Sequence, residues 1–186
     1  MGNSISKVFA IILAVLVMFM MPTYQNYKKH EDLAYLNTYK TVTNFTDSVR
    51  MKGYITPEMY KEFSLALHNG SNVLFDIEIE HQQKVYNPVY TDPSNPNSFT
   101  GEYKVDYESF STAQINKVLF ESSVPYNERM YKLQQDDYFY VTVRNKTKFK
   151  STMMLDFITA NIAGNDEVIY FPYGGLVLNE DWNERK

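Results

Sequence analysis

The sequence predicts an α+β fold, in which an N-terminal transmembrane helix continues into an amphipathic helix and is followed by an antiparallel sheet with packed helices. Three observations lead to this prediction. The chain opens on an unbroken apolar run, apolar residues then recur at helical spacing, and several later segments alternate apolar and polar residues with the period of a strand. We therefore divide the chain into a transmembrane anchor (1–27), a stalk helix (28–52) and an extracytoplasmic α+β head (53–186).

The apolar run from Val8 to Met21 is expected to be a membrane anchor. A transmembrane helix usually needs about 20 residues, and the wider segment from Ile5 to Tyr24 supplies that length, or about 30 Å of helix. Ala14 is small and offers a point of close approach to another helix. The anchor residues are Val8, Phe9, Ile11, Ile12, Leu13, Ala14, Val15, Leu16, Val17 and Phe19.

A cleaved signal peptide and a buried core helix are the alternatives to an anchor. Cleavage would need a small-x-small site after the apolar core, and the segment from Met20 to Tyr24 contains none. Lys7 precedes the run while Lys28 and Lys29 follow it, so charge alone leaves the orientation open. Because long domains translocate largely regardless of charge, we expect a single-pass protein of the cell membrane with its C-terminal domain outside.

The stalk carries one apolar stripe, which we regard as the candidate interface with other subunits. Its members recur at steps of 4, 3, 3 and 4, which is the period of a helix face. Pro22 is expected to bend the rod, and Gly53 to end it. The stripe consists of Tyr35, Tyr39, Val42, Phe45 and Val49.

The head is expected to alternate helices and strands. Thr56-Pro57-Glu58 is a helix start, and alternating apolar residues mark strands around residues 75–79, 103–107 and 139–143. The other expected elements are a loop at 88–100, helices after Ser111 and Ser151 (the second closing at Gly164), a strand at 130–133, a hairpin around Pro172–Gly175 and a loose tail from Glu180. We expect Phe63, Ile77, Val141 and Ile158 to be buried.

Composition excludes several functional classes. The chain has no cysteine, which rules out disulfides, thiolate metal sites and a cysteine nucleophile. An exported domain without disulfides is typical of bacteria, and we favour a Gram-positive source. The net charge of −4 gives no sign of the basic face that nucleic-acid binding needs. The 16 tyrosines either fill the rim of a small core or form a protein interface.

No motif for catalysis or cofactor binding is present. The sequence has no G-x-S-x-G, P-loop or G-x-G-x-x-G pattern. His30, His68 and His81 lie on three different predicted elements, and we interpret them as structural or surface residues. Asp76, Glu78 and Glu80 share one strand face, where a solvated surface is favoured over a cation site. We therefore expect no catalytic residue, no metal, no cofactor and no small-molecule substrate, and a chain that is not an enzyme.

An apolar N-terminal helix, a bend at Pro22, an amphipathic continuation and an α+β head together resemble a type IV pilin or pseudopilin. The segments GYITPEMY, DIEIEH and FPYGGLVLNED also resemble uncharacterised Firmicute membrane proteins of Tad/Flp-type pilus or secretion loci. The resemblance implies that the helix anchors the subunit and packs in a filament core. Pilins carry a glycine before the cleavage site and a glutamate early in the apolar run; here Gly2 is followed by a polar segment and the run has no acid.

These observations leave two functions from different classes. The first is a non-enzymatic subunit of a cell-surface assembly, a pilin-like minor component of a Tad/type IV-like pilus or secretion machine, whose partners are the membrane and other subunits. The second is a monomeric, membrane-tethered extracytoplasmic binding or sensing module. An anchored hydrolase is a third and less favoured class, because no nucleophile, base and orienting group occur as a set.

Overall fold

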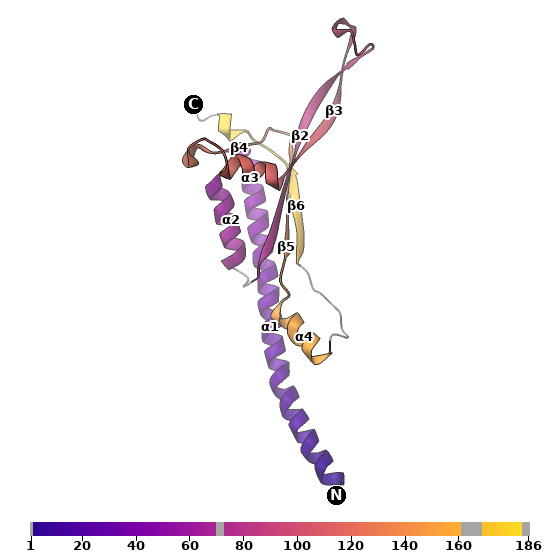
Figure 1. Cartoon of the computed structure of the whole chain (residues 1–186), viewed down its shortest axis with the longest axis vertical. Coiled ribbons are helices and arrows are strands. Elements are labelled where there is room, and N and C mark those ends of the chain that lie inside the picture. The colour runs from indigo at the N-terminus through magenta and orange to yellow at the C-terminus, as the bar shows by residue number, and fades with distance from the viewer. Residues whose placement is uncertain (1, 70–72, 161–168, 184–186) are drawn as a thin grey trace.

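The computed structural model describes residues 2–69, 73–160 and 169–183, and it is a long helical rod with a two-layer head (Figure 1). The N-terminus and the tip of a long hairpin lie at opposite ends of the molecule. The helices and strands are α1 (Gly2–Lys52), β1 (Tyr54–Ile55), α2 (Pro57–Asn69), β2 (Phe75–Tyr90), β3 (Phe99–Ser111), α3 (Thr112–Phe120), β4 (Tyr131–Lys132), β5 (Tyr138–Asn145), α4 (Lys150–Ile158) and β6 (Tyr170–Leu176). The predicted α+β class is confirmed.

Anchor and stalk form one uninterrupted helix, α1, with Pro22 inside it. Proline lacks the N–H of its own helical bond and crowds the preceding turn. The Thr23 hydroxyl donates to the Phe19 carbonyl at 2.9 Å, which gives a carbonyl of this turn an additional donor. The helix runs on into the head without a break and curves in its N-terminal part (Figure 1).

Gly53 ends α1, as predicted. Its φ of 72° lies in the left-handed region that glycine adopts without strain, and its N–H donates to the Val49 carbonyl at 2.8 Å. The Gly53 carbonyl then accepts from the Leu133 N–H at 2.8 Å. This bond places β1 beside β4, and the two form a short antiparallel pair at the end of the rod.

The main sheet has four antiparallel strands in the order β3-β2-β5-β6. The predicted alternation in β5 is confirmed, because Phe139, Val141 and Val143 are all fully buried. They lie opposite His81, Ile79 and Ile77 of β2 in the register of the ladder. The odd-numbered side chains of both strands therefore form the core face of the sheet.

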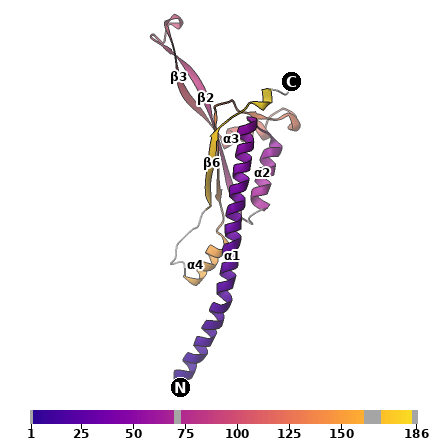
Figure 2. The same ribbon diagram turned by 180° about the vertical axis from the view of Figure 1, so that it is seen from behind.

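α1 and α2 cover this face of the sheet (Figure 2). The rings of Phe45 on α1 and Phe63 on α2 stack with centroids 4.1 Å apart, and Phe45 also meets Phe139 edge-on at 6.4 Å. The core is therefore a layer of side chains between two helices and one sheet face. Phe63 and Val141 are buried as predicted, and Ile77 is half-buried against the same core.

α3 begins where the sequence predicted. The Ser111 N–H donates to the Gln114 side chain at 2.8 Å, as the helix start requires. The Thr112 hydroxyl donates to the Ile79 carbonyl at 3.0 Å and accepts from the Ile79 N–H at 2.7 Å. These two bonds fasten the start of α3 to β2, with Ile115 and Leu119 fully buried.

The expected loop at 88–100 is shorter than predicted, because both of its ends belong to strands. β2 continues to Tyr90 and β3 starts at Phe99, and from Gln83 onward β2 pairs with β3 alone. The result is a two-stranded ribbon that projects past the sheet (Figure 1). The turn is confined to residues 91–98, where the Ser98 hydroxyl donates to the Asp92 carbonyl at 2.7 Å. Pro88 misled the prediction, because proline is tolerated on a strand without a second neighbour.

The hairpin expected around Pro172–Gly175 is wrong. Residues 170–176 form a single strand, β6, paired with β5 along its whole length. β6 is the edge of the sheet, where proline is tolerated. The glycines serve close packing: a Cβ at Gly174 would meet the backbone of Phe139 and Tyr140, and one at Gly175 would meet the Arg50 guanidinium.

The last predicted helix is correct in existence and wrong in what it buries. α4 runs from Lys150 to Ile158, and its buried residues are Ser151 and Thr152. Ile158 is 51% exposed, contrary to the prediction, because the helix lies beside the rod and away from the sheet. The predicted end of this helix at Gly164 lies outside the described residues.

The C-terminal segment up to residue 183 is docked, contrary to the expectation of a loose tail. The Trp182 indole N–H donates to the Leu133 carbonyl at 2.8 Å. The Glu180 carboxylate accepts from the Gln135 N–H at 2.8 Å. The segment therefore closes the end of the head where β1 and β4 pair.

The burial pattern predicts opposite outcomes for two apolar truncations. Phe63→Ala removes a ring from the centre of the core and should cost about 3–5 kcal/mol of unfolding free energy. Ile158→Ala changes an exposed residue and should stay within about 0.5 kcal/mol. Guanidinium denaturation of the full-length chain in detergent micelles, followed by circular dichroism, measures both values. Equal losses would contradict the placement of α4 outside the core.

Candidate membrane anchor and assembly surface

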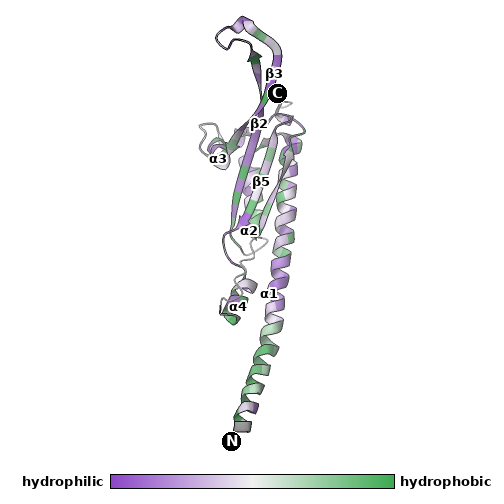
Figure 3. Cartoon of the chain, turned by 90° about the vertical axis from the view of Figure 1, so that its right-hand side faces the viewer, coloured by the Kyte–Doolittle hydropathy of each residue, from purple (hydrophilic) through white to green (hydrophobic). Residues whose placement is uncertain are grey.

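The anchor residues lie on the part of α1 that the rest of the chain leaves uncovered. Within the described residues, one helix is long and apolar enough to cross a membrane, and the apolar window in it is not buried at all. Figure 3 shows the hydropathy changing along α1, which is apolar toward the N-terminus and mixed within the head. Because this apolar segment is not covered by the rest of the chain, the alternative that it is a buried core helix is disfavoured. The large anchor residues, all at least 52% exposed, are Val8, Phe9, Ile11, Ile12, Leu13, Val15, Leu16, Val17 and Phe19.

The stalk stripe is only partly an available interface. Val42 and Val49 are fully buried and Phe45 is 8% exposed, so these three belong to the core of the head. The buried stripe continues toward the N-terminus through Ala34 and Thr38. Small side chains at these two positions let the helix lie close to its neighbours. The predicted interface at Val42, Phe45 and Val49 is therefore corrected to a core seam.

Tyr35 and Tyr39 flank this seam and remain about half exposed. The Tyr39 ring meets Phe171 of β6 edge-on at 5.2 Å between centroids. Leu33 and Leu36 are also more than half exposed on this stretch of α1. Above the anchor, α1 thus presents aromatic and aliphatic side chains that its own head covers only in part.

α4 packs beside α1 next to the anchor. The Ser151 hydroxyl donates to the buried Glu31 carboxylate of α1, and Lys28 lies 3.7 Å from the same carboxylate. Leu155 and Ile158, further along α4, line an apolar groove of about 430 Å³ together with anchor residues. The α1 side of this groove consists of Leu13, Leu16, Val17, Met20, Met21 and Tyr24.

A buried polar network lies in the head, at His81. Its Nε2 lies 2.9 Å from Asp137, and its Nδ1 lies 2.7 Å from the Tyr131 hydroxyl. A neutral imidazole that donates to Asp137 and accepts from Tyr131 satisfies both bonds. Asp137 also accepts from the N–H groups of Lys84 at 2.9 Å and Gln134 at 2.7 Å. The carboxylate therefore ties β2, the turn before β5 and the imidazole together.

This network borders a cavity of about 440 Å³ beside Trp182. Its hydrogen bonds connect segments of the head, and its groups are not activated for a reaction. Burial lowers the pKa of His81, against the raising effect of Asp137. Burial also raises the pKa of Tyr131, helped by the charge of Asp137, so its hydroxyl stays protonated and is a poor nucleophile. The geometry gives a hydrogen-bonded triad without an activated nucleophile.

The acidic residues singled out on β2 are paired. Asp76 lies 3.1 Å from Lys146, and Glu78 lies 3.6 Å from Arg144, on the face of the sheet away from α1. Glu80 accepts from Gln82 and Ser109, and these bonds lower its pKa. Among the residues that the structure describes, no group of three histidine, aspartate or glutamate side chains is arranged to hold a metal ion.

Two tertiary contacts were outside the reach of sequence reasoning. Glu31 and Ser151 are 120 residues apart, and His81 and Asp137 are 56 apart. Each of these residues has an ordinary local role: Glu31 continues a helix, and Asp137 follows a turn. No local pattern marks such long-range polar pairs, because a hydrogen bond leaves no periodicity in either partner's segment.

Comparison with known proteins leaves the family of the chain open. No family model, no curated protein and no solved structure matches it.

The lowered pKa of His81 predicts a loss of head stability in mild acid. Because the folded pKa lies below the ordinary value of 6.5, the neutral form is favoured by folding, and its contribution is complete above that pH. It is lost as the pH falls toward the folded pKa, with a slope of at most about 1.4 kcal/mol per pH unit. Guanidinium midpoints of the full-length protein between pH 7.5 and 5 measure this. His81→Asn should flatten the dependence over that window; an unchanged slope in the variant would refute the assignment.

Proposed function

We propose that this chain is a non-enzymatic, membrane-anchored subunit of a bacterial cell-surface assembly, a pilin-like minor component of a Tad/type IV-like pilus or secretion machine. The observation that carries the proposal is the dual role of α1. One helix supplies an uncovered apolar rod at its N-terminal end and the core of the head at its C-terminal end. A helix shared in this way couples the orientation of the head to whatever packs against the rod.

The coupling is mechanical, because the junction between rod and head has no linker. α1 continues through residues 22–34 without a break, and the Ser151–Glu31 contact with α4 supports this stretch from the side. Loose tethers are typically flexible, glycine- or serine-rich segments. A continuous helix suits a subunit whose head must take a defined position among neighbours.

The rod offers a surface on which another helix can pack. Ala10 and Ala14 lie one turn apart on the same side of α1. Small residues at this spacing let two helix backbones approach closely, and in lipid such packing drives association because bulk hydrophobicity gives no preference. Tyr35 and Tyr39 would extend this contact beyond the membrane, where tyrosine supplies apolar area with a polar tip.

A monomeric, membrane-tethered binding or sensing module is the second candidate, and the projecting ribbon of β2 and β3 favours it. Aromatic side chains are exposed along this ribbon, and the ribbon itself projects away from the rod (Figure 1). A solvent-exposed aromatic arm is a feature of recognition surfaces. The residues are Tyr86, Tyr90, Phe99, Tyr103 and Tyr107. In either case we place the head outside the cell membrane of a Gram-positive bacterium.

An exchange of the rod separates the two candidates. Replacing residues 5–21 with an unrelated apolar helix should keep the protein in the membrane fraction but abolish recovery of its partner subunits in a mild-detergent pull-down. Ala14→Leu should reduce recovery in the same way, because a larger side chain blocks close approach. The matched control is Ile12→Phe, which enlarges the opposite side of the helix and should recover partners normally.

The alternative outcome is equally defined. If the foreign helix recovers the same partners as the native rod, the anchor is only a tether and the pilin-like proposal fails. Loss of partners on Tyr103→Ser, with the rod exchange silent, would favour the ribbon as the binding surface and the tethered module as the function.

A further inference from the structure

α4 carries an apolar surface that the head does not bury. Phe157 is 83% exposed, Ile158 is 51% exposed and Met153 is 49% exposed, within a helix of nine residues. The helix thus turns its small polar residues, Ser151 and Thr152, inward and leaves its large apolar residues outside. This is the reverse of the arrangement that folding in water alone favours.

The position of α4 along the rod identifies what covers this surface. Ser151 contacts Glu31 above the anchor, whereas Leu155 and Ile158 share a groove with residues between Leu13 and Tyr24. α4 therefore descends alongside α1 from the polar part of the rod into the level of the apolar part. In Figure 3 the apolar end of α4 lies at about the height where α1 itself becomes apolar.

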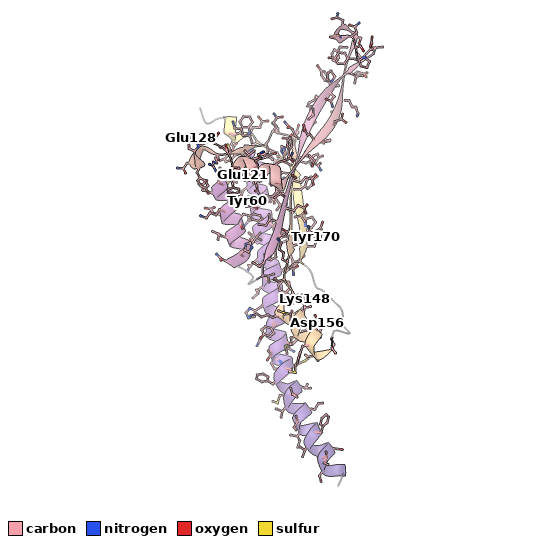
Figure 4. The ribbon with its side chains drawn as sticks, viewed as in Figure 1. Tyr60, Glu121, Glu128, Lys148, Asp156 and Tyr170 are labelled. Atoms are coloured by element: carbon pink, nitrogen blue, oxygen red, sulfur yellow. The ribbon has the colours of Figure 1, made fainter. Side chains whose placement is uncertain are left out.

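The charges on α4 are arranged for this depth. Asp156, the only acidic residue of the helix, lies 3.2 Å from Lys148, and Figure 4 shows the two side by side next to the rod. Pairing reduces the cost of bringing that carboxylate near lipid. Lys150 is exposed at the upper end of α4, and Lys28 and Lys29 follow the anchor on α1. Cations at this level, with apolar side chains below them, suit contact with phospholipid phosphates.

We propose that α4 is an interfacial helix that dips into the leaflet next to the head, so that Met153, Phe157 and Ile158 contact lipid and the groove shared with α1 is filled by acyl chains. The inference rests on the proposed membrane anchor, and it adds a second membrane contact to it. With α1 crossing the bilayer and α4 lying against it, the head is held at a fixed height and tilt above the surface. A single membrane helix would leave that tilt free.

Depth-dependent quenching tests this inference in the full chain. Because the protein has no cysteine, Phe157→Cys and Met153→Cys each carry one environment-sensitive fluorophore, such as NBD, without further changes. The proteins are reconstituted into phosphatidylcholine–phosphatidylglycerol vesicles containing doxyl-labelled phospholipid. Val15→Cys in the rod reports on the anchor, and Tyr103→Cys on the ribbon, 59% exposed in the native chain, reports on a site in water.

We expect a large loss of fluorescence at 157 and 153, approaching that at position 15, and none at 103. Quenching at 15 with no quenching at 157 or 153 would overturn the interfacial helix and leave the anchor standing. Failure of quenching at 15 would remove the anchor and the inference with it. If quenching at 157 appears only when the protein is diluted in lipid, a second copy of the chain covers this face and the assignment to lipid is wrong.

Discussion

The buried seam of α1 packs against α2 and β5, and the other parts of the head are placed relative to that packing. Val42, Phe45 and Val49 lie in the seam, and the stack of Phe45 on Phe63 joins both helices to the sheet face formed by β2 and β5. The seam belongs to the same helix as the exposed apolar rod. The helix must therefore be compatible with two environments, a protein interior at one end and an exposed apolar surface at the other.

This constraint explains several local features. Ala34 and Thr38 are small because α1 passes close to its neighbours there, and the glycines of β6 are small because the strand lies against Arg50 and Tyr140. The end of the helix is closed by Gly53, whose carbonyl starts the β1–β4 pair. The C-terminal segment then returns to this end, with Trp182 on Leu133. The head is built around the end of one helix, so its orientation follows the axis of the rod.

The buried polar contacts in the head hold its elements in position, and they do not form a reactive group. Asp137 accepts from three donors, two on β2 and one in the turn before β5, and Glu31 holds α4 to the rod. Buried carboxylates of this kind are costly unless they are paired, so they are found where a particular geometry has to be kept. In this chain they fix the turn before β5 and the helix nearest the anchor. Both positions bear on how the head stands relative to the apolar rod.

Local patterns in the sequence were sufficient for the class, for the long N-terminal helix with its end at Gly53, for α2, for the start of α3 and for the alternation of Phe139, Val141 and Val143. Each depends on residues within a few positions of one another, through caps and periodicity. The exposed apolar part of α1 could also be predicted from the sequence, because a long run of apolar residues without a polar face is typical of a transmembrane helix.

Tertiary structure alone decided which apolar faces are covered, and by what. Periodicity placed Tyr35 and Tyr39 on the stripe with Val42, but the seam runs through Ala34 and Thr38 because close contact selects small side chains. Pro172 and two glycines indicated a turn, yet residues 170–176 form one continuous strand. Proline is tolerated there because β6 is an edge strand, and glycine is needed because Tyr140 and Arg50 leave no room for a side chain. Ile158 fits a helical pattern equally well whether that face meets protein or lipid. A period records that one side of an element is apolar, and only the packed chain determines what lies against it.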